Sequence, residues 1–284
     1  MDPICYLQFA SGNLIWPLSP AEIRRTIATR VILVSMSRKT SSPESIPAPK
    51  DNGILVGTSG FGYTEWRGTF YPQDLPTKKF LAYYAQHFQT TEINNTFYRI
   101  PTTALTQSWY SEVPEDFQFT LKLSQEITHR RKLKDVGAEM QRFLDGAAAL
   151  KEKLAIVLVQ LPPFFRKETG TLAEFLNNFS SRAKFAFEFR HPSWFSDDIY
   201  ELLKAQRCAL AVVEKEEGQG ADAPRLATGP FVYMRLRKGE YSKAELEEWA
   251  RWIRSQAVNV YCYLKHDEKA PLLARKMLEA LKAT

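Results

Sequence analysis

The chain has few cysteines and no arrangement of them that indicates covalent cross-linking. Its 284 residues include three, Cys5, Cys208 and Cys262, which lie far apart and form no C-x-x-C pair. A disulfide framework needs closely recurring thiols, so this sequence is typical of a protein from a reducing compartment. We therefore expect a cytoplasmic location.

Long apolar runs are also missing. The best stretches, near residues 4–16 and 31–36, are short and interrupted, whereas a membrane-spanning helix needs roughly 18 apolar residues. The first residues carry no basic region ahead of an apolar stretch, as a secretory signal would. We expect neither a membrane span nor a secretory signal.

Neither positive nor negative charge is strongly in excess. The chain has 38 Lys and Arg against 32 Asp and Glu, a formal net charge of +6, which suits an anionic ligand and equally an ordinary solvated surface. The hydrophobic share of 44% and the charged share of 25% match globular proteins and exclude global disorder, collagen and coiled coil. The length allows one large or two ordinary domains.

The composition changes near residue 50. Residues 35–52 read SMSRKTSSPESIPAPKDN and are rich in Ser, Pro and charge, which is the composition of a linker. We expect residues 1–50 to form an extension and linker without stable structure, and residues 51–284 to form one folded domain.

After Gly53, short apolar runs alternate with helical patterns, which indicates a parallel sheet covered by helices. The expected strands are Ile54–Ser59, Thr90–Tyr98, Phe117–Ser124, Leu154–Leu161, Lys184–Arg190, Cys208–Glu214, Phe231–Arg237 and Asn259–Lys265. Eight strands in about 230 residues fit an α/β fold of the (β/α)₈ TIM-barrel type. A doubly wound open sheet is the alternative.

Helical patterns separate most of these strands. The clearest are Lys78–Phe88, Val136–Lys151, Leu172–Phe179, Asp197–Gln206 and Lys243–Gln256. Ser242 and Glu245 form a capping-box pattern before the last of them. The connection Glu216–Gly229 is expected to be a loop.

Alternation within the strands indicates which side chains face the barrel interior, because the helix-facing set should be apolar. The inward sets are Glu92, Asn94, Thr96 and Tyr98; Gln118, Thr120, Lys122 and Ser124; Ala186, Glu188 and Arg190; Tyr233, Arg235 and Arg237; and Tyr261, Tyr263 and Lys265. Their polar members gather toward the carboxyl ends of the strands, where barrel enzymes place their active sites.

The barrel mouth is therefore expected to be highly charged. Its acids are Glu92, Glu188, Glu214 and Asp267, and its bases are Lys122, Arg190, Arg235, Arg237 and Lys265. Buried charges cost several kcal/mol each unless they are paired or meet a ligand, so the pattern favours a functional site. The alternative is an internal ion-pair lattice that replaces a hydrophobic plug.

Five motifs occur in order along the second part of the chain. They are GTSGFGYTEWRGTFYP at 57–72, EINNTFYR at 92–99, ITH at 127–129, QLPP at 160–163 and FEFRHPSW at 187–194. In these motifs the chain resembles the YecE-like family, domain of unknown function 72, from about residue 54 to its end. The resemblance implies a (β/α)₈ barrel. It implies no particular activity, because the YecE-like family is uncharacterised and its activity is not established.

The chain departs from the family pattern in three places. Arg237 stands where a His is usual, Glu214 stands where an Asp is common, and residues 264–267 read LKHD in place of FNND. Arg235 and Asp267 are retained. The mouth becomes more basic, so a substrate should not be transferred from relatives.

The candidate catalytic residues are Glu92, Glu188 and His191. Two carboxylates in unlike surroundings can be pushed apart in pKa, one protonated and one charged, as acid/base chemistry or glycoside hydrolysis requires. We expect Arg190 to keep one of them ionised. His191 would shuttle protons, and the alternative is that His191 and the residues after it form a rigid turn.

The candidate substrate-binding residues are Trp66, Asn94, Lys122, Gln160, Arg190, Arg235, Lys265 and Asp267. Arg and Lys would hold an anionic group, while Asn94 and Gln160 would orient hydroxyls or a carbonyl. The glycines of residues 57–62 would either cradle a phosphate or serve tight turning alone.

The cofactor stays open, and no metal ligand is assigned. His129 and His266 could join Glu92, Glu188 and Asp267 around a divalent metal, although no short ligand spacing supports this.

Two functional classes follow. The first is an enzyme, such as a hydrolase, lyase or isomerase, acting on an anionic or polyhydroxylated small molecule. The second is a nucleic-acid-binding or phosphodiester-processing protein that uses the same basic mouth. There the mouth accepts a phosphodiester, and the basic run 128–134 and the aromatic residues Trp66, Tyr71 and Trp194 contact the polymer. A binding scaffold without chemistry is a third interpretation.

Overall fold

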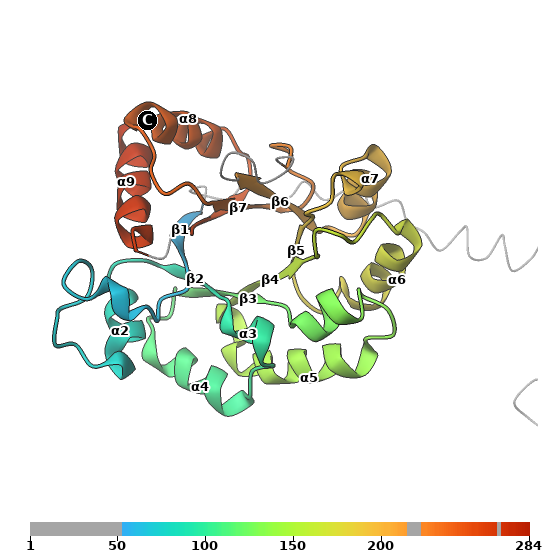
Figure 1. Cartoon of the computed structure of the whole chain (residues 1–284), viewed down its shortest axis with the longest axis horizontal. Coiled ribbons are helices and arrows are strands. Elements are labelled where there is room, and N and C mark those ends of the chain that lie inside the picture. Colours follow the sequence, from blue (N-terminus) through green and yellow to red (C-terminus); the bar gives the residue numbers. More distant parts are fainter. Residues whose placement is uncertain (1–52, 215–222, 266–267) are drawn as a thin grey trace, which may run out of the picture. The chain divides into compact units, whose positions relative to one another are not determined.

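The computed structural model describes residues 53–214, 223–265 and 268–284. Within them, parallel strands close into a barrel in the order in which they occur along the chain (Figure 1). The strands are β1 (Ile54–Ser59), β2 (Thr90–Ile93), β3 (Gln118–Lys122), β4 (Leu154–Gln160), β5 (Phe185–Glu188), β6 (Ala209–Glu214), β7 (Phe231–Leu236) and β8 (Asn259–Leu264). β1 pairs with β8 from Ile54–Val260 to Thr58–Leu264, which closes the ring. The predicted (β/α)₈ barrel is confirmed, and the open sheet is wrong.

Helices surround the barrel on its outside (Figure 1). They are α2 (Phe80–Tyr84), α3 (Asn95–Tyr98), α4 (Thr103–Glu112), α5 (Gly137–Ala147), α6 (Thr169–Phe179), α7 (Asp197–Ala205), α8 (Lys243–Arg254) and α9 (Ala270–Ala283). Short 3₁₀ turns occur at Thr64–Trp66, Thr77–Lys79, Ala148–Lys153 and Pro192–Trp194, and a π-helical turn at Glu126–Arg130. None of the helices within the described ranges is long and apolar enough to cross a membrane.

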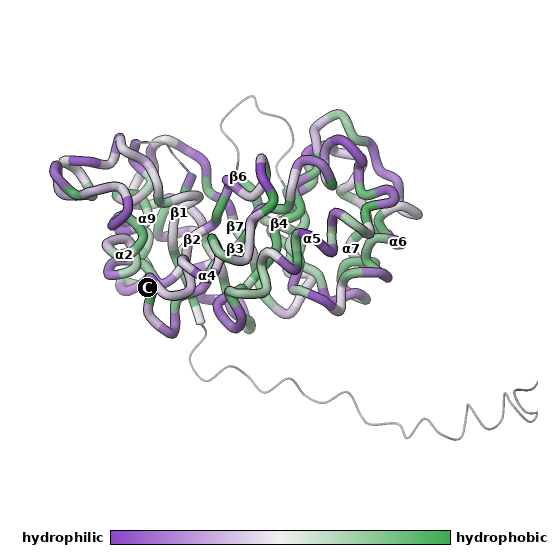
Figure 2. The backbone as a smooth tube through the Cα atoms, turned by 90° about the horizontal axis from the view of Figure 1, so that it is seen from below, coloured by the Kyte–Doolittle hydropathy of each residue, from purple (hydrophilic) through white to green (hydrophobic). Residues whose placement is uncertain are grey.

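Strand alternation sorts the core into two layers, as the sequence pattern predicts. Phe185, Phe187 and Phe189 belong to the large cluster between the barrel and the helices. Ala186, Tyr233, Tyr261 and Tyr263 belong to a separate cluster inside the barrel. Figure 2 shows hydrophobic residues concentrated along the strands and hydrophilic ones along the outer loops.

β2 is shorter than expected. It ends at Ile93, and Asn95–Tyr98 is helical. The Thr96 hydroxyl donates to the carbonyls of Ile93, at 3.1 Å, and Lys122, at 2.7 Å, and such local bonds favour a turn over an extended strand. Tyr98 consequently points to solvent, with 74% of its surface exposed. Its expected place on the inner face with Glu92 was wrong.

Glu214 also lies on the other face from the one expected. Ala209, Ala211 and Val213 are the inner residues of β6. Glu214 accepts hydrogen bonds from Tyr241, at 2.5 Å, and from Lys238, at 3.2 Å, on the helix side. It therefore belongs to the β6–α8 packing and not to the barrel mouth.

The five expected helices are present within a few residues of their expected limits, although α2 begins as a 3₁₀ turn and ends at Tyr84. The capping box forms at the start of α8, where Ser242 and Glu245 bond each other's backbone amides. α4 and α9 lacked a clear sequence signal. Residues 223–229 of the expected loop are not helical, while 215–222, like the predicted extension at 1–50, lie outside the described residues.

Candidate functional site

A charged layer fills the carboxyl end of the barrel interior. Glu92 on β2, Glu188 on β5 and Arg235 on β7 are each at most 1% exposed. One guanidinium bridges both carboxylates: Arg235 Nη2 lies 2.7 Å from Glu92 Oε1, and Arg235 Nη1 lies 2.5 Å from Glu188 Oε2. The alternation within the strands correctly predicted that these three side chains lie inside the barrel.

The remaining carboxylate oxygens are also bound. Glu188 Oε1 accepts from Arg237 Nη2 at 2.7 Å and from Gln160 Nε2 at 2.8 Å. Gln160 reaches it because it is the register partner of Glu188 across β4 and β5. The Tyr233 hydroxyl donates to Glu92 Oε2. Each glutamate is thus held through both oxygens.

Both carboxylates are ionised. Burial by itself would raise the pKa of Glu92, but Arg235 and the hydrogen bond from Tyr233 outweigh it and lower that pKa below its usual range. Burial likewise opposes ionisation of Glu188, and Arg235 and Arg237 together lower its pKa strongly. The expectation that one of the two is protonated, as acid/base chemistry requires, is not supported.

A glycoside-hydrolase arrangement is not supported either. Such enzymes keep sugar and water between their two carboxyl groups, whereas here the Arg235 guanidinium lies between the two and bonds both. The residue that keeps Glu188 ionised is not Arg190 as expected, because Arg190 is exposed. Arg235 and Arg237 do so.

Glu92, Glu188, Arg235 and Arg237 form a buried ion-pair lattice. Lys122 lies beside this lattice. It is the last residue of β3, partly buried, and its Nζ lies 4.1 Å from the centre of the Phe97 ring. Desolvation and the positive charge of Arg235 lower the pKa of Lys122 to about 8, although Glu188 and Glu92 act in the opposite direction. No carboxylate of the described residues forms an ion pair with it.

His129 lies next to the same ring. The centre of its imidazole lies 4.9 Å from the centre of the Phe97 phenyl ring, and its Nδ1 is 2.9 Å from the Thr128 hydroxyl. Desolvation, Lys122 and Arg190 lower the pKa of His129 to about 4, so the ring is neutral at pH 7. It stands in the π-helical turn after β3, and such turns are frequent at functional sites.

Among the described residues of the mouth, positive charge is in excess. Glu92 and Glu188 are paired with Arg235 and Arg237, which leaves the positive charges of Lys122 and Lys265 uncompensated within the described part of the mouth. Lys265 is exposed just after β8, and its pKa is lowered by desolvation and by the two arginines. The buried Nε atoms of Arg235 and Arg237 have no acceptor among the described residues. An anionic group would complement this arrangement.

Four other residues considered from the sequence have local roles or lie outside the described part. The Nδ1 of His191 accepts from the Ser193 amide at 3.1 Å and caps the 3₁₀ turn that follows, which favours the rigid turn over a proton shuttle. Asn94 is partly exposed and caps α3 without a side-chain bond. Asp267 and His266 fall outside the described residues.

The aromatic surface expected for a nucleic acid does not form. Trp66 and Trp194 are fully buried and Tyr71 is 1% exposed. Trp66 packs against Phe70 and Tyr71, so a substrate-binding role for Trp66 is not supported. The sequence places these rings on the correct loops but does not indicate that they pack against one another.

The basic run at 128–134 is largely neutralised. Arg130 and Arg131 pair with Glu126, at 3.0 and 3.6 Å. Arg131 also pairs with Glu139, and Lys134 lies 2.7 Å from Glu168. The nucleic-acid interpretation therefore loses the two loop features that supported it, while its use of the basic mouth stays a prediction.

Gly57 within β1 and Gly60 after it are explained by the local backbone packing. A Cβ on Gly57 would lie 2.0 Å from the Thr90 carbonyl oxygen, because β1 and β2 approach closely there. Gly60 has a φ of +98° and donates its amide to the Glu92 carbonyl at 2.7 Å. Close strand packing at Gly57 and a tight turn at Gly60 account for the two positions, and no phosphate is needed to explain them.

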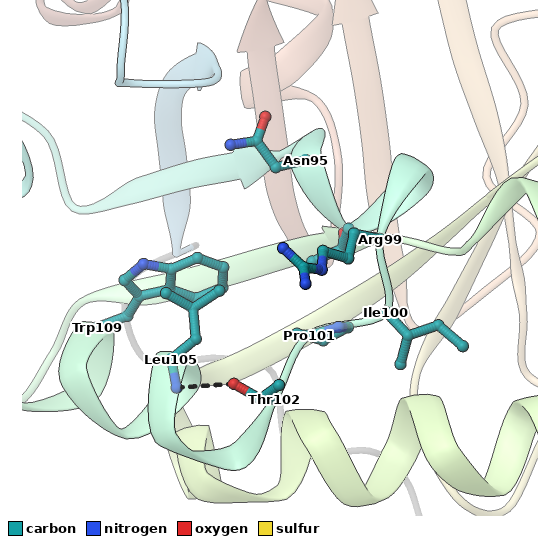
Figure 3. Close-up of a pocket in the computed structure, with 8 residues that line it drawn as sticks. Asn95, Arg99, Ile100, Pro101, Thr102, Leu105 and Trp109 are labelled. Atoms are coloured by element: carbon teal, nitrogen blue, oxygen red, sulfur yellow. Dashed lines mark hydrogen bonds between the residues drawn. The ribbon is translucent and has the colours of Figure 1, made fainter.

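A separate cavity of about 490 Å³ lies between α3 and α4 (Figure 3). Ile100, Pro101, Leu105 and Trp109 form its apolar lining, and Arg99 is its one charged lining residue. It lies on the helix side of the barrel and shares no residue with the charged layer.

No group of three or more His, Cys, Asp or Glu that could hold a metal occurs among the described residues. The oxygens of Glu92 and Glu188 are engaged by Arg235, Arg237, Gln160 and Tyr233. The metal arrangement considered from the sequence also included His266 and Asp267, which are outside the described residues.

The sequence reasoning missed three contributors to this site. Tyr233 and Arg237 were expected inside the barrel but not as partners of the glutamates. Phe97 was placed on the outer face of β2, whereas the turn at Asn94–Tyr98 brings it against Lys122. The only available signal was Thr96, whose hydroxyl favours such a turn.

Comparisons with known proteins agree with the fold. A family model described as "Protein of unknown function DUF72" matches residues 55–284. UPF0759 protein YunF of Bacillus subtilis (strain 168) is 30% identical over 181 residues, which are 59% of this chain and 63% of YunF. UPF0759 protein YecE of Escherichia coli (strain K12) is 29% identical over 117 residues, 41% of this chain and 43% of YecE. The chain thus matches less than two thirds of the length of either relative.

Solved structures extend the comparison. A DUF72 family protein of Thermotoga maritima MSB8 matches with a TM-score of 0.72 and 27% identity, covering 81% of this chain and 99% of that one. A DUF72 family protein of Enterococcus faecalis V583, 20% identical with a TM-score of 0.69, shares the fold and covers 81% of this chain and 96% of its own.

Proposed function

This chain belongs to the DUF72 family of proteins of unknown function, and we propose that it is an enzyme that binds an anionic small molecule at the mouth of its barrel. The observation that carries the proposal is the charge balance of that mouth. Two fully paired glutamates are surrounded by Arg235, Arg237, Lys122 and Lys265, so two positive charges stay without a carboxylate partner among the described residues.

Each side chain has a distinct task in this proposal. Glu92 and Glu188 act as ionised anchors that fix Arg235, and they do not donate protons. Arg237 and Lys265 bind the anionic group of the ligand, with Arg237 offering its unpartnered Nε–H. A preorganised set of cations loses little side-chain entropy on binding, which favours affinity.

The site is better suited to an anion than to a neutral polyhydroxylated compound. Sugar hydroxyls need both donors and acceptors, whereas the glutamate oxygens are already occupied. Donors therefore predominate in the mouth. Carboxylate and phosphate are the groups that complement them.

Thermal unfolding with added anions tests the proposal. At constant ionic strength, phosphate, pyruvate, citrate and glycerol phosphate are added to the full chain and to its Lys265→Met and Lys282→Met variants. Lys282 is the matched control, an exposed lysine in the last turn of α9, at the other end of the barrel. A ligand at 100 times its Kd adds about 2.7 kcal/mol to the free energy of unfolding and raises the Tm.

We expect at least one anion to raise the Tm of the parent and of Lys282→Met, and to raise that of Lys265→Met less. If no anion stabilises the parent, or if both variants respond just as the parent does, the mouth is a structural ion-pair lattice and the proposal fails.

A further inference from the structure

Lys122 differs from the other cations of the mouth in its surroundings. Arg235 and Arg237 each bond a carboxylate, and Lys265 is exposed. Lys122 Nζ instead faces the Phe97 ring at 4.1 Å, and no ion pair with a described carboxylate holds it. Its amine is therefore not engaged by the lattice beside it.

Desolvation, followed by the neighbouring cations, makes the Lys122 amine easier to deprotonate than that of an ordinary lysine. Arg235 on β7 and Lys265 after β8 place positive charge near it, and the carboxylates of Glu92 and Glu188 only partly offset them. Lys122 in turn acts on His129 of the following turn, whose imidazole is neutral at pH 7. With the pKa of Lys122 at about 8, a substantial fraction of the amine is unprotonated near pH 7.5.

A lysine that is partly desolvated and next to a cation is an activated nucleophile toward carbonyl groups. The position fits that chemistry, because Lys122 ends a barrel strand at the edge where barrel enzymes bind substrates. The loop that follows is also unusual in its backbone: Lys132, Leu133 and Asp135 have φ values of +50°, +69° and +52°. Strain of this kind collects at functional sites.

We propose that Lys122 forms a covalent imine with the carbonyl carbon of an anionic aldehyde or ketone bound at the barrel mouth. This rests on the proposed function, since Arg237 and Lys265 would hold the anionic group while Lys122 reacts. The inference narrows the ligand from anions in general to carbonyl compounds that carry a carboxylate or phosphate.

The reaction balances without any further reagent. The nitrogen lone pair of the neutral amine attacks the carbonyl carbon, the C=O π electrons move to oxygen, and a proton lost from nitrogen reaches that oxygen to give a carbinolamine. The second N–H proton then leaves with the hydroxyl group as water, and the C=N double bond forms. One amine and one carbonyl give one imine and one water.

Reductive trapping tests the inference. The full chain is incubated at pH 7.5 with pyruvate or pyridoxal 5′-phosphate, an anionic ketone and an anionic aldehyde, in the presence of sodium cyanoborohydride. Hydride from this reagent reduces the imine to a stable secondary amine, which peptide mass spectrometry locates. We expect Lys122 to be labelled at least about ten-fold faster than exposed lysines such as Lys78 and Lys282, because more of its amine is neutral.

The Lys122→Arg variant separates this inference from the proposed function. Arginine keeps the positive charge but cannot form the imine, so labelling at this position should disappear while anions still raise the Tm. In the parent, the rate of labelling at Lys122 should rise with pH and level off above about pH 8.

Labelling spread evenly over the surface lysines, with anions still stabilising the parent, would overturn the imine and leave anion binding intact. If anions neither stabilise the parent nor direct labelling to Lys122, both proposals fail. Because these readouts come from the parent protein, they do not depend on how well the variant folds.

Discussion

At the scale of single residues, the barrel mouth shows how one guanidinium can decide the state of two acids. Glu92 and Glu188 are buried and would be protonated if they were alone, yet Arg235 contacts both. Breaking a buried ion pair from one side is costly because it strands a charge, whereas the intact pair adds little net stability. The lattice therefore destabilises the fold when any one of its members is removed, because the remaining charges lose their partners.

Arg235→Met should lower the free energy of unfolding at pH 7 by about 3–5 kcal/mol, because two carboxylates lose their common partner. Urea denaturation measures the loss. The control is Arg190→Met, since Arg190 is exposed, and we expect it to stay within about 0.5 kcal/mol of the parent.

The deficit of Arg235→Met should shrink at pH 5. Glu188 keeps its ion pair with Arg237, whereas Glu92 loses the guanidinium that pairs with it. Burial then raises the pKa of Glu92 above its unfolded value, and a group with a raised pKa gains stability as the pH falls. Equal urea midpoints for Arg235→Met and the parent at pH 7 would show that Arg235 does not hold the lattice together.

The residue scale also shows the limits of sequence patterns. Alternation identified Glu92, Glu188, Arg235 and Lys122 as inward residues, because each strand must show its apolar face to the helices. It could not foresee that Trp66 is enclosed by other aromatic rings, and it could not decide between a proton shuttle and the rigid turn that His191 caps. Both outcomes depend on loop packing, which has no fixed period.

At the scale of secondary-structure elements, the strands were predictable because large apolar residues recur at period two. Along β5 and the residue after it, Phe185, Phe187 and Phe189 all face the helix layer, and the position of the strand follows directly. β2 was predicted too long because the same alternation continues past Ile93, where the side-chain bonds of Thr96 take over. α4 was missed, and buried residues along it are few, namely Thr106 and Trp109.

β1 and β2 approach so closely that Gly57 is required. A methyl group there would lie 2.0 Å from the backbone oxygen of Thr90, which cannot rotate away. We expect Gly57→Ala to lower the free energy of unfolding by about 1–3 kcal/mol or more, as overpacking of a core does.

Gly62→Ala provides the matched control for Gly57→Ala. Nothing lies within 4 Å of its added Cβ, so its urea midpoint should stay near that of the parent. Gly57→Ala with unchanged stability would mean that the two strands are farther apart than the structure has them.

At the scale of the whole domain, the two-layer core and the charged mouth have separate consequences. The outer layer joins strands and helices through large apolar side chains, while the inner layer ends in tyrosines, threonines and the ion-pair lattice. A polar plug depends on the ionisation of its members. The stability of this fold should therefore depend on pH more than that of a barrel with an apolar interior.

Stability should fall as the pH falls below about 6.5. The pKa of His129 is about 4 in the folded chain, against an ordinary histidine value of 6.5, so the unfolded state takes up a proton first, and the free energy of unfolding decreases from pH 6.5 toward 4. The pKa values of Glu92 and Glu188 are lowered from 4.5. Their contribution is present above about pH 5 and is lost at lower pH.

Urea denaturation at steps of half a pH unit, on the parent and on His129→Gln, separates the contribution of His129 to the pH dependence from that of Glu92 and Glu188. Because His129 is only partly buried, we expect its part to be about 1–2 kcal/mol between pH 6.5 and 4.5. His129→Gln should lose that slope and keep the steeper fall below pH 5, since the buried glutamates remain. If the free energy of unfolding of the parent is constant from pH 6.5 to 4.5, the pKa of His129 is not lowered. If the stability of His129→Gln no longer falls below pH 5, the whole pH dependence belongs to the imidazole and not to the lattice.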